Sequence, residues 1–187
     1  MSENLRKFHK AIYALDAVVR RTPDDAWDNQ SGCTEWTARE VLGHVIWGLT
    51  NVANRAYGED PPPQQPEADV AGVDPRATWS EARDRVLAAL DRPGVLQRVE
   101  TTPFGEMAVD DFLGFYPCDP LAHAWDIAQA SGIDPALPVD LCEAGLAGLA
   151  AIGDGLRGPG AMGPAVAIED DAGIVAKFLA ISGRNPG

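Results

Sequence analysis

The chain contains few of the residues that build most enzyme centres, with only three histidines and three cysteines among 187 residues. The cysteines, Cys33, Cys118 and Cys142, are odd in number, and no two of them form a Cys-x-x-Cys pair. This pattern argues against a disulfide framework. It is typical of reduced thiols, and we therefore expect a cytoplasmic protein.

Positive charge is also scarce. Lysine and arginine number 15 against 28 aspartates and glutamates, which gives a formal net charge of −13 at pH 7. Because no cluster of basic residues offsets this excess, the surface is expected to repel a phosphate backbone or an anionic membrane. Neither nucleic acid nor a membrane is therefore an expected partner.

Long apolar runs and nucleotide-binding motifs are missing as well. No stretch approaches the roughly 20 apolar residues of a membrane span, and Met1–Asn4 lacks the basic and apolar regions of a signal peptide. Gly-x-Gly-x-x-Gly, P-loop and nucleophile-elbow motifs are absent. With 45% hydrophobic residues, the chain is instead expected to fold as one domain with a substantial core.

Helical patterns fill most of the chain. Apolar residues recur at helical spacing from Glu3 to Arg21 and predict a first helix there. The second helix has the clearest start signal, because Thr37 and Glu40 form a capping box and Trp36 precedes it as half of a hydrophobic staple. Further helices are expected over residues 78–90, opened by a second capping-box pattern at Thr78 and Glu81, and over residues 111–129, 139–156 and 171–181.

Three segments have other patterns. Residues 58–76 are proline-rich and acidic and predict a long surface loop. Residues 99–109 predict two short strands joined by the turn Thr102–Gly105, and residues 164–168 are the other candidate strand. Long helices with so little strand indicate a mainly all-α protein, a helical bundle with a short hairpin.

Two of the three histidines stand inside apolar helical segments. His44 belongs to the second predicted helix, and His123 follows Asp119 by four residues. Residues i and i+4 share a helix face, so Asp119 and His123 can point at one spot. If His44 faces the same spot, two imidazoles and a carboxylate form a ligand set for a transition metal, with positions left open for water or substrate.

Each candidate ligand also has a structural interpretation. A lone histidine beside an apolar face is more often a core or boundary residue than a ligand. Asp119 precedes Pro120, and an Asp-Pro pair often starts a helix, so Asp119 can instead cap a helix that begins at Pro120. Pro117 is a further sign that the helix is broken here. In that case water or another acid, Asp126 or Glu40, would complete the site.

The remaining reactive residues give weaker signals. Cys33 precedes the capped helix, whose N-terminus can lower a thiol pKa, but no histidine is near it in sequence to act as a base. Cys118 is expected to be a buried thiol, and His9 is expected to face solvent. Trp47 and Trp125 are expected in the core. The sequence names no catalytic residue.

Two stretches carry a family resemblance. The first is Cys33-Thr34-Glu35-Trp36-Thr37 followed by Val41-Leu42-Gly43-His44, which resembles the first histidine signature of DinB-like proteins from actinobacteria. The second signature, D-x-x-x-H-x-W-D-x-A, resembles Asp119–Ala128, and Phe178–Pro186 is similar to the ending of one branch. The wider family includes mycothiol-dependent maleylpyruvate isomerase, and the resemblance covers nearly the whole chain.

The resemblance implies a fold and a ligand set. The fold is a DinB-like four-helix bundle in a single domain, residues 1–187, with the bundle and metal site in residues 1–132 and a C-terminal helical extension in residues 133–187. The ligands carried over are His44, Asp119 and His123, for a divalent metal that is expected to be Zn²⁺, with Ni²⁺ or Fe²⁺ as alternatives. The chain after residue 132 is shorter than the separate C-terminal domain of the isomerase.

From the resemblance we expect a metal- and thiol-dependent enzyme of isomerase or S-transferase type that acts on a small molecule, with mycothiol as the thiol. The metal would hold the thiol as thiolate or polarise a substrate carbonyl. Two alternatives stay open: a metal-activated hydrolase that uses no thiol, and a non-catalytic bundle that binds small molecules or protein partners. A homodimer is compatible with each of them.

Overall fold

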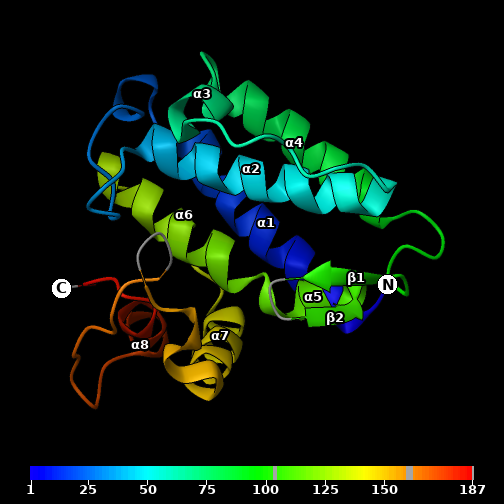
Figure 1. Cartoon of the computed structure of the whole chain (residues 1–187). Helices are drawn as coiled ribbons and strands as arrows, with labels where there is room; N and C mark the ends of the chain where they lie inside the picture. Colours follow the sequence, from blue (N-terminus) through cyan, green and yellow to red (C-terminus); the bar gives the residue numbers. More distant parts are fainter. Residues whose placement is uncertain (103–104, 159–161, 187) are drawn as a thin grey trace.

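The computed structural model describes residues 1–102, 105–158 and 162–186. Four long helices form its centre: α1 (Glu3–Arg21), α2 (Ala38–Tyr57), α4 (Pro75–Leu90) and α6 (Cys118–Ser131). Helix α2 packs against α4 and α6, and α1 packs against α6 and α4, as Figure 1 shows. The expected mainly all-α, DinB-like fold is confirmed.

Local signals at the first two helices act as predicted. Helix α1 has the expected bounds, and its N-cap is Ser2, whose hydroxyl accepts a hydrogen bond from the backbone amide of Leu5. At α2 the capping box is complete, because Thr37 accepts from the Glu40 amide while the Glu40 carboxylate accepts from the Thr37 amide. A capping box satisfies amides that the helix leaves unpaired. It thereby fixes the first residue of the helix that carries His44.

The third long helix begins earlier than predicted. Helix α4 starts at Pro75, and its N-cap is Asp74, whose carboxylate accepts from the Ala77 amide. The predicted capping box at Thr78 and Glu81 is therefore wrong, and both residues lie inside the helix. An Asp-Pro pair is the stronger start signal, because proline has no amide to leave unpaired at the first helical position.

The predicted loop over residues 58–76 contains a short helix, α3 (Glu67–Ala71), so that interpretation needs correction. Helix α3 packs on α2. At the contact, a Cβ added to Gly43 would lie 1.8 Å from the backbone oxygen of Glu67. Only glycine allows this approach, one residue before His44.

The predicted helix over residues 111–129 is two helices. Helix α5 (Val109–Phe115) ends before Pro117, and α6 begins at Cys118. Proline cannot donate the backbone hydrogen bond that would continue a helix, so the break falls at Pro117. Helix α6 ends at Gly132, which adopts a left-handed conformation with φ of 64°, as the Ser131-Gly132 stop signal predicted.

The hairpin is confirmed. Strand β1 (Val99–Thr102) pairs antiparallel with β2 (Gly105–Ala108) and places Val99 opposite Ala108. Residues 103–104 of the predicted turn lie outside the described residues.

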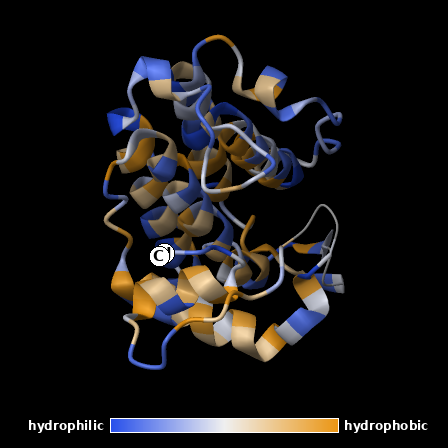
Figure 2. Cartoon of the chain, turned by 90° about the vertical axis from the view of Figure 1, so that its left-hand side faces the viewer, coloured by the Kyte–Doolittle hydropathy of each residue, from blue (hydrophilic) through white to orange (hydrophobic). Residues whose placement is uncertain are grey.

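After α6 the chain forms α7 (Val139–Ile152), a short 3-10 turn (Gly153–Leu156) and α8 (Ile174–Ile181). The predicted strand at residues 164–168 is wrong: the segment has no strand partner, and its Val166 amide donates to the Ala180 carbonyl beside α8. Helices α7 and α8 pack on each other, low in Figure 1, and hydrophobic colours dominate this region in Figure 2.

One hydrophobic core runs through the bundle. Its largest fully buried side chains include Phe8, Leu15, Leu42, Trp79 and Ile127. Phe178 of α8 belongs to the same core, so the C-terminal helices pack onto the bundle. Among the described residues, no helix is both long enough and apolar enough to cross a membrane.

Candidate metal centre

Helices α2 and α6 bring the three predicted ligands together. His44 Nε2 lies 3.7 Å from Asp119 Oδ1, and His123 Nε2 lies 3.4 Å from the same oxygen. One ligand atom from each residue lies within 4.8 Å of the others. The two imidazole rings meet edge to face, with ring centroids 5.1 Å apart.

The break at Pro117 determines what Asp119 does. Because α6 starts at Cys118, Asp119 is the second helical residue, and no side chain caps this helix end. The alternative in which Asp119 caps a helix starting at Pro120 is therefore wrong. Its carboxylate faces the two imidazoles instead, and His123 stands one turn further along the same helix face.

Two residues behind His123 hold its ring. The Asp126 carboxylate, fully buried, lies 2.9 Å from His123 Nδ1 through Oδ2. Arg184, in the tail after α8, donates two hydrogen bonds to the same carboxylate. Its Nη2 donates to Oδ2 at 2.7 Å, and its Nε donates to Oδ1 at 3.2 Å. A carboxylate on Nδ1 leaves Nε2 as the atom directed at a metal, the arrangement that orients many metal-binding histidines.

The sequence had offered Asp126 and Glu40 as replacement ligands. The Asp126 oxygens are occupied by His123 and Arg184, and Glu40 is occupied by the capping box. Neither carboxylate belongs to the cluster of candidate ligand atoms found in the described part of the chain. The role of Arg184 was not predicted, because 58 residues separate it from Asp126 and only the tail motif containing it gave a signal.

The electrostatics of the cluster call for a cation. Burial disfavours ionised Asp119, but the charges and hydrogen bonds of His123 and His44 outweigh it and lower the pKa of this carboxyl. Burial also lowers the pKa of His123, yet Asp119 and Asp126 outweigh that effect and raise it to about 9. With Nδ1–H donated to Asp126, a neutral His123 would aim a lone pair at the Asp119 carboxylate. A proton or a metal ion relieves this contact between two acceptors.

The donor atoms fit zinc. Two ligands bound tetrahedrally at about 2.1 Å from one zinc ion lie about 3.4 Å apart. This is close to the 3.4 Å and 3.7 Å that separate Asp119 Oδ1 from Nε2 of His123 and of His44. The Asp119 side chain is 41% exposed and that of His44 37%, whereas His123 is only 8% exposed. Such a half-open set of three donors leaves room for a further ligand from solvent.

One aromatic side chain forms a wall beside the cluster. The Trp36 ring lies 5.0 Å from the His44 ring and 6.4 Å from the His123 ring, centroid to centroid. The sequence assigned Trp36 only to the hydrophobic staple of α2. Trp36 immediately precedes Thr37, the N-cap of the helix that carries His44, and it therefore lies near the His44 ring.

Comparison with known proteins gives a family. The model of the mycothiol maleylpyruvate isomerase N-terminal domain matches residues 8–128, more than half of the chain. The chain belongs to this family. The expected resemblance is thus confirmed, and His44, Asp119, His123 and Asp126 all lie within the matched domain, while Arg184 lies beyond it.

Two proteins of known sequence resemble the chain over most of its length. The uncharacterized proteins MT0763 and Rv0738 of Mycobacterium tuberculosis, strains CDC 1551 / Oshkosh and ATCC 25618 / H37Rv, are each 31% identical over 160 residues, covering 83% of both chains. No solved structure matches significantly.

The cysteines of this family member are poor nucleophiles. Burial raises the pKa of Cys33, so the expectation that the α2 N-terminus lowers it is wrong. Burial also raises the pKa of Cys118 and of Cys142 to about 11 each. Thiolate is the reactive form of cysteine, so little of any of the three thiols is reactive at neutral pH.

His9, expected to face solvent, is half-buried, and burial lowers its pKa. Its ring packs between the rings of Phe8 and Tyr13, and its Nε2 is buried without a hydrogen-bond partner among the described residues. It takes no part in the cluster.

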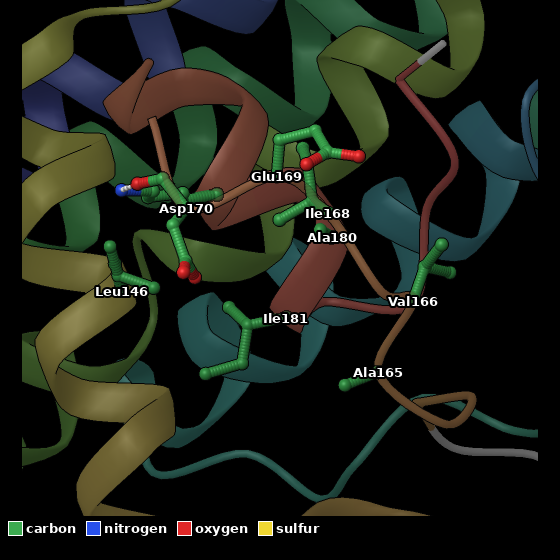
Figure 3. Close-up of a pocket in the computed structure, with 9 residues that line it drawn as sticks. Leu146, Ala165, Val166, Ile168, Glu169, Asp170, Ala180 and Ile181 are labelled. Carbon is green, nitrogen blue, oxygen red and sulfur yellow. Dashed lines mark hydrogen bonds between the residues drawn. The ribbon is translucent and has the colours of Figure 1, made fainter. Parts of the chain in front are cut away.

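A separate hollow of about 250 Å³ lies between α7, α8 and residues 165–170 (Figure 3). Leu146, Val166, Ile168 and Ile181 give it apolar walls, and Asp170 stands at its edge. It shares no lining residue with the cluster and contains neither histidine nor cysteine. Glu169 and Lys177 also line it, and the hollow is separate from the cluster.

Proposed function

We propose that the protein binds one divalent metal ion, Zn²⁺ in the first place, through His44, Asp119 and His123, and uses it with a low-molecular-weight thiol to transform a small molecule. The observation that supports this most is the convergence of the three donor atoms, at separations suited to tetrahedral zinc. Isomerisation or S-transfer is the reaction type that the family suggests.

A divalent ion at this place would lower the pKa of a bound thiol or water and polarise a substrate carbonyl. The chain's own residues contribute the geometry. Asp126 holds His123 with Nε2 toward the ion, Arg184 neutralises and orients Asp126, and Trp36 shields one side. The Asp119 and His44 side chains remain partly exposed, which gives a small ligand access from solvent.

An external thiol is favoured over a cysteine of the chain. All three thiols have raised pKa values, and none belongs to the metal-ligand cluster found among the described residues. Thiol chemistry at this centre therefore requires a thiol from solution, and mycothiol is the one that the family description names.

The first test is metal binding. Protein stripped with a chelator and titrated with Zn²⁺ against a chromophoric competitor should bind close to one equivalent, and His44→Ala should abolish tight binding. Asp119→Asn should weaken binding sharply with unchanged helix content by circular dichroism, because a neutral amide oxygen is a poor donor. Failure of the wild type to bind Zn²⁺ would refute the site.

The second test separates the reaction classes. Mycothiol added to Co²⁺-loaded protein should give the intense near-ultraviolet absorption of a thiolate bound to cobalt, and Asp119→Asn should lose it. A metal-loaded protein without thiol binding would favour metal-activated hydrolysis. Absence of metal binding would leave a non-catalytic, small-molecule-binding bundle.

A further inference from the structure

A tyrosine stands at the break between α5 and α6, next to the cluster. Tyr116 is the last residue before Pro117, and its carbonyl accepts the backbone amide of Asp119 at 3.2 Å. Its ring is held between aromatic neighbours, with centroids 5.3 Å from Phe8 and 6.0 Å from Phe112. The ring is thus fixed by packing on two sides, so its hydroxyl has a defined position.

The hydroxyl reaches across to α2. A Cβ added to Gly48 would lie 2.7 Å from Tyr116 Oη. Glycine inside a helix costs roughly 1 kcal/mol relative to alanine, and at this position it makes space for the hydroxyl. Gly48 follows His44 by one turn on the same helix face, so Tyr116 Oη lies one turn along α2 from a ligand.

No hydrogen bond to the Tyr116 hydroxyl occurs among the described residues. The buried side-chain atoms without a partner in that part of the chain belong to His9 and Arg76, not to Tyr116. The hydroxyl is therefore not fully buried, and it keeps some contact with solvent. The Asp119 charge acts on the Tyr116 side chain, so the two residues are neighbours. A phenol is protonated at neutral pH, and its hydroxyl can therefore donate a hydrogen bond.

We propose that Tyr116 Oη donates a hydrogen bond to an anionic oxygen, of a carboxylate or an enolate, on the ligand that occupies the open metal position. This inference rests on the proposed function. The inference adds the ligand class to the proposed function: the ligand carries an anionic oxygen that binds the metal ion and accepts a hydrogen bond from the phenol. A thiolate sulfur would gain much less from a phenol donor, so Tyr116 selects for the oxygen-bearing substrate.

The test compares Tyr116→Phe with wild type, using Co²⁺ as the metal and acetate as the probe. Phenylalanine keeps the packing against Phe8 and Phe112 and removes only the hydroxyl. Co²⁺ affinity should be unchanged, because Tyr116 is not a ligand, and acetate affinity, followed by the cobalt visible bands, should fall about tenfold for the loss of one hydrogen bond to an anion. Tyr13→Phe, which removes an exposed hydroxyl on α1, is the matched control.

A second variant tests the position of the hydroxyl. Gly48→Ala places a methyl group against Oη and should displace it, so acetate affinity should fall although the hydroxyl is present. Melting temperature supplies a further readout: removing a hydroxyl without a partner should leave it unchanged or raise it. Equal acetate affinity in Tyr116→Phe and wild type would overturn the inference, as would a lower melting temperature with equal affinity. If wild-type protein binds no Co²⁺, the proposed metal site fails first.

Discussion

Asp16 and Asp119 lie in different parts of the bundle and differ in the kind of partner that surrounds the carboxylate. Asp16 on α1 accepts hydrogen bonds from Trp79 and Arg83 of α4 and pairs with Arg20 at 2.8 Å. Its partners are donors, so it needs nothing from outside. Asp119, in contrast, faces the nitrogens of two histidines and is 41% exposed.

The kind of partner distinguishes a polar cluster that stabilises the fold from one that can bind a ligand. Permanent cations saturate Asp16, which joins α1 to α4. Around Asp119 the nearest groups change between acceptor and donor with protonation, and the cluster is complete only with a proton or a metal. Stability should therefore depend on the first cluster and metal affinity on the second.

The largest expected effects separate the two clusters directly. His123→Ala should lower Zn²⁺ affinity by more than the roughly 10- to 100-fold that loss of an outer-shell partner causes, while its fold persists. Asp16→Ala should leave Zn²⁺ affinity unchanged but cost about 3 kcal/mol of unfolding free energy, since it removes the buried acceptor of Trp79 Nε1 and of Arg83 Nη1, although Arg83 keeps its pair with Asp84. Competition titration and urea unfolding measure the two effects. A loss of metal affinity in Asp16→Ala would break the distinction.

Intermediate effects are expected behind His123. Asp126→Asn should weaken Zn²⁺ binding about 10- to 100-fold, because an amide holds the imidazole less firmly than a carboxylate. Arg184→Gln should act in the same direction but more weakly, since it acts through Asp126. Arg76→Gln, which removes an arginine from a pair with the exposed Asp24, is the control. Unchanged affinity in Asp126→Asn would show that the ring needs no support from this carboxylate.

The smallest effect is a pH dependence of the metal-free protein. The pKa of His123, raised to about 9, lies above the ordinary value of about 6.5 expected after unfolding. Its contribution to stability should therefore be complete below about pH 6.5 and disappear as the pH rises through about 9. Urea unfolding between pH 6 and 10 should show this decline, and His123→Gln should lack it. A zinc-loaded sample should show it much less, because the bound imidazole carries no proton on Nε2.

Local sequence signals predicted what depends on a few neighbouring residues. The bounds of α1, the capping box of α2, the hairpin and the Gly132 stop all came from such signals. Errors arose where two local signals competed. Asp74-Pro75 prevailed over Thr78 as the start of α4, and Pro117 divided the helix that hydrophobic spacing had made continuous.

The candidate site shows the same division. Its three residues could be named from the sequence, because i,i+4 spacing places Asp119 and His123 on one face and the two histidine motifs carry a family resemblance. The supporting residues could not. The pairing of Arg184 with Asp126, the placement of Trp36 beside His123, and the approach of Tyr116 to Gly48 each join segments far apart in the chain.

The sequence by itself determined the helices, their caps and the chemistry of the donor atoms, since these follow from backbone hydrogen bonding and side-chain type over a few residues. The tertiary structure alone decided that Asp119 faces two imidazoles instead of capping its helix. That outcome depends on the break at Pro117 and on the packing of α6 against α2. Distances between helices are set by how whole faces pack, and no local pattern contains that information.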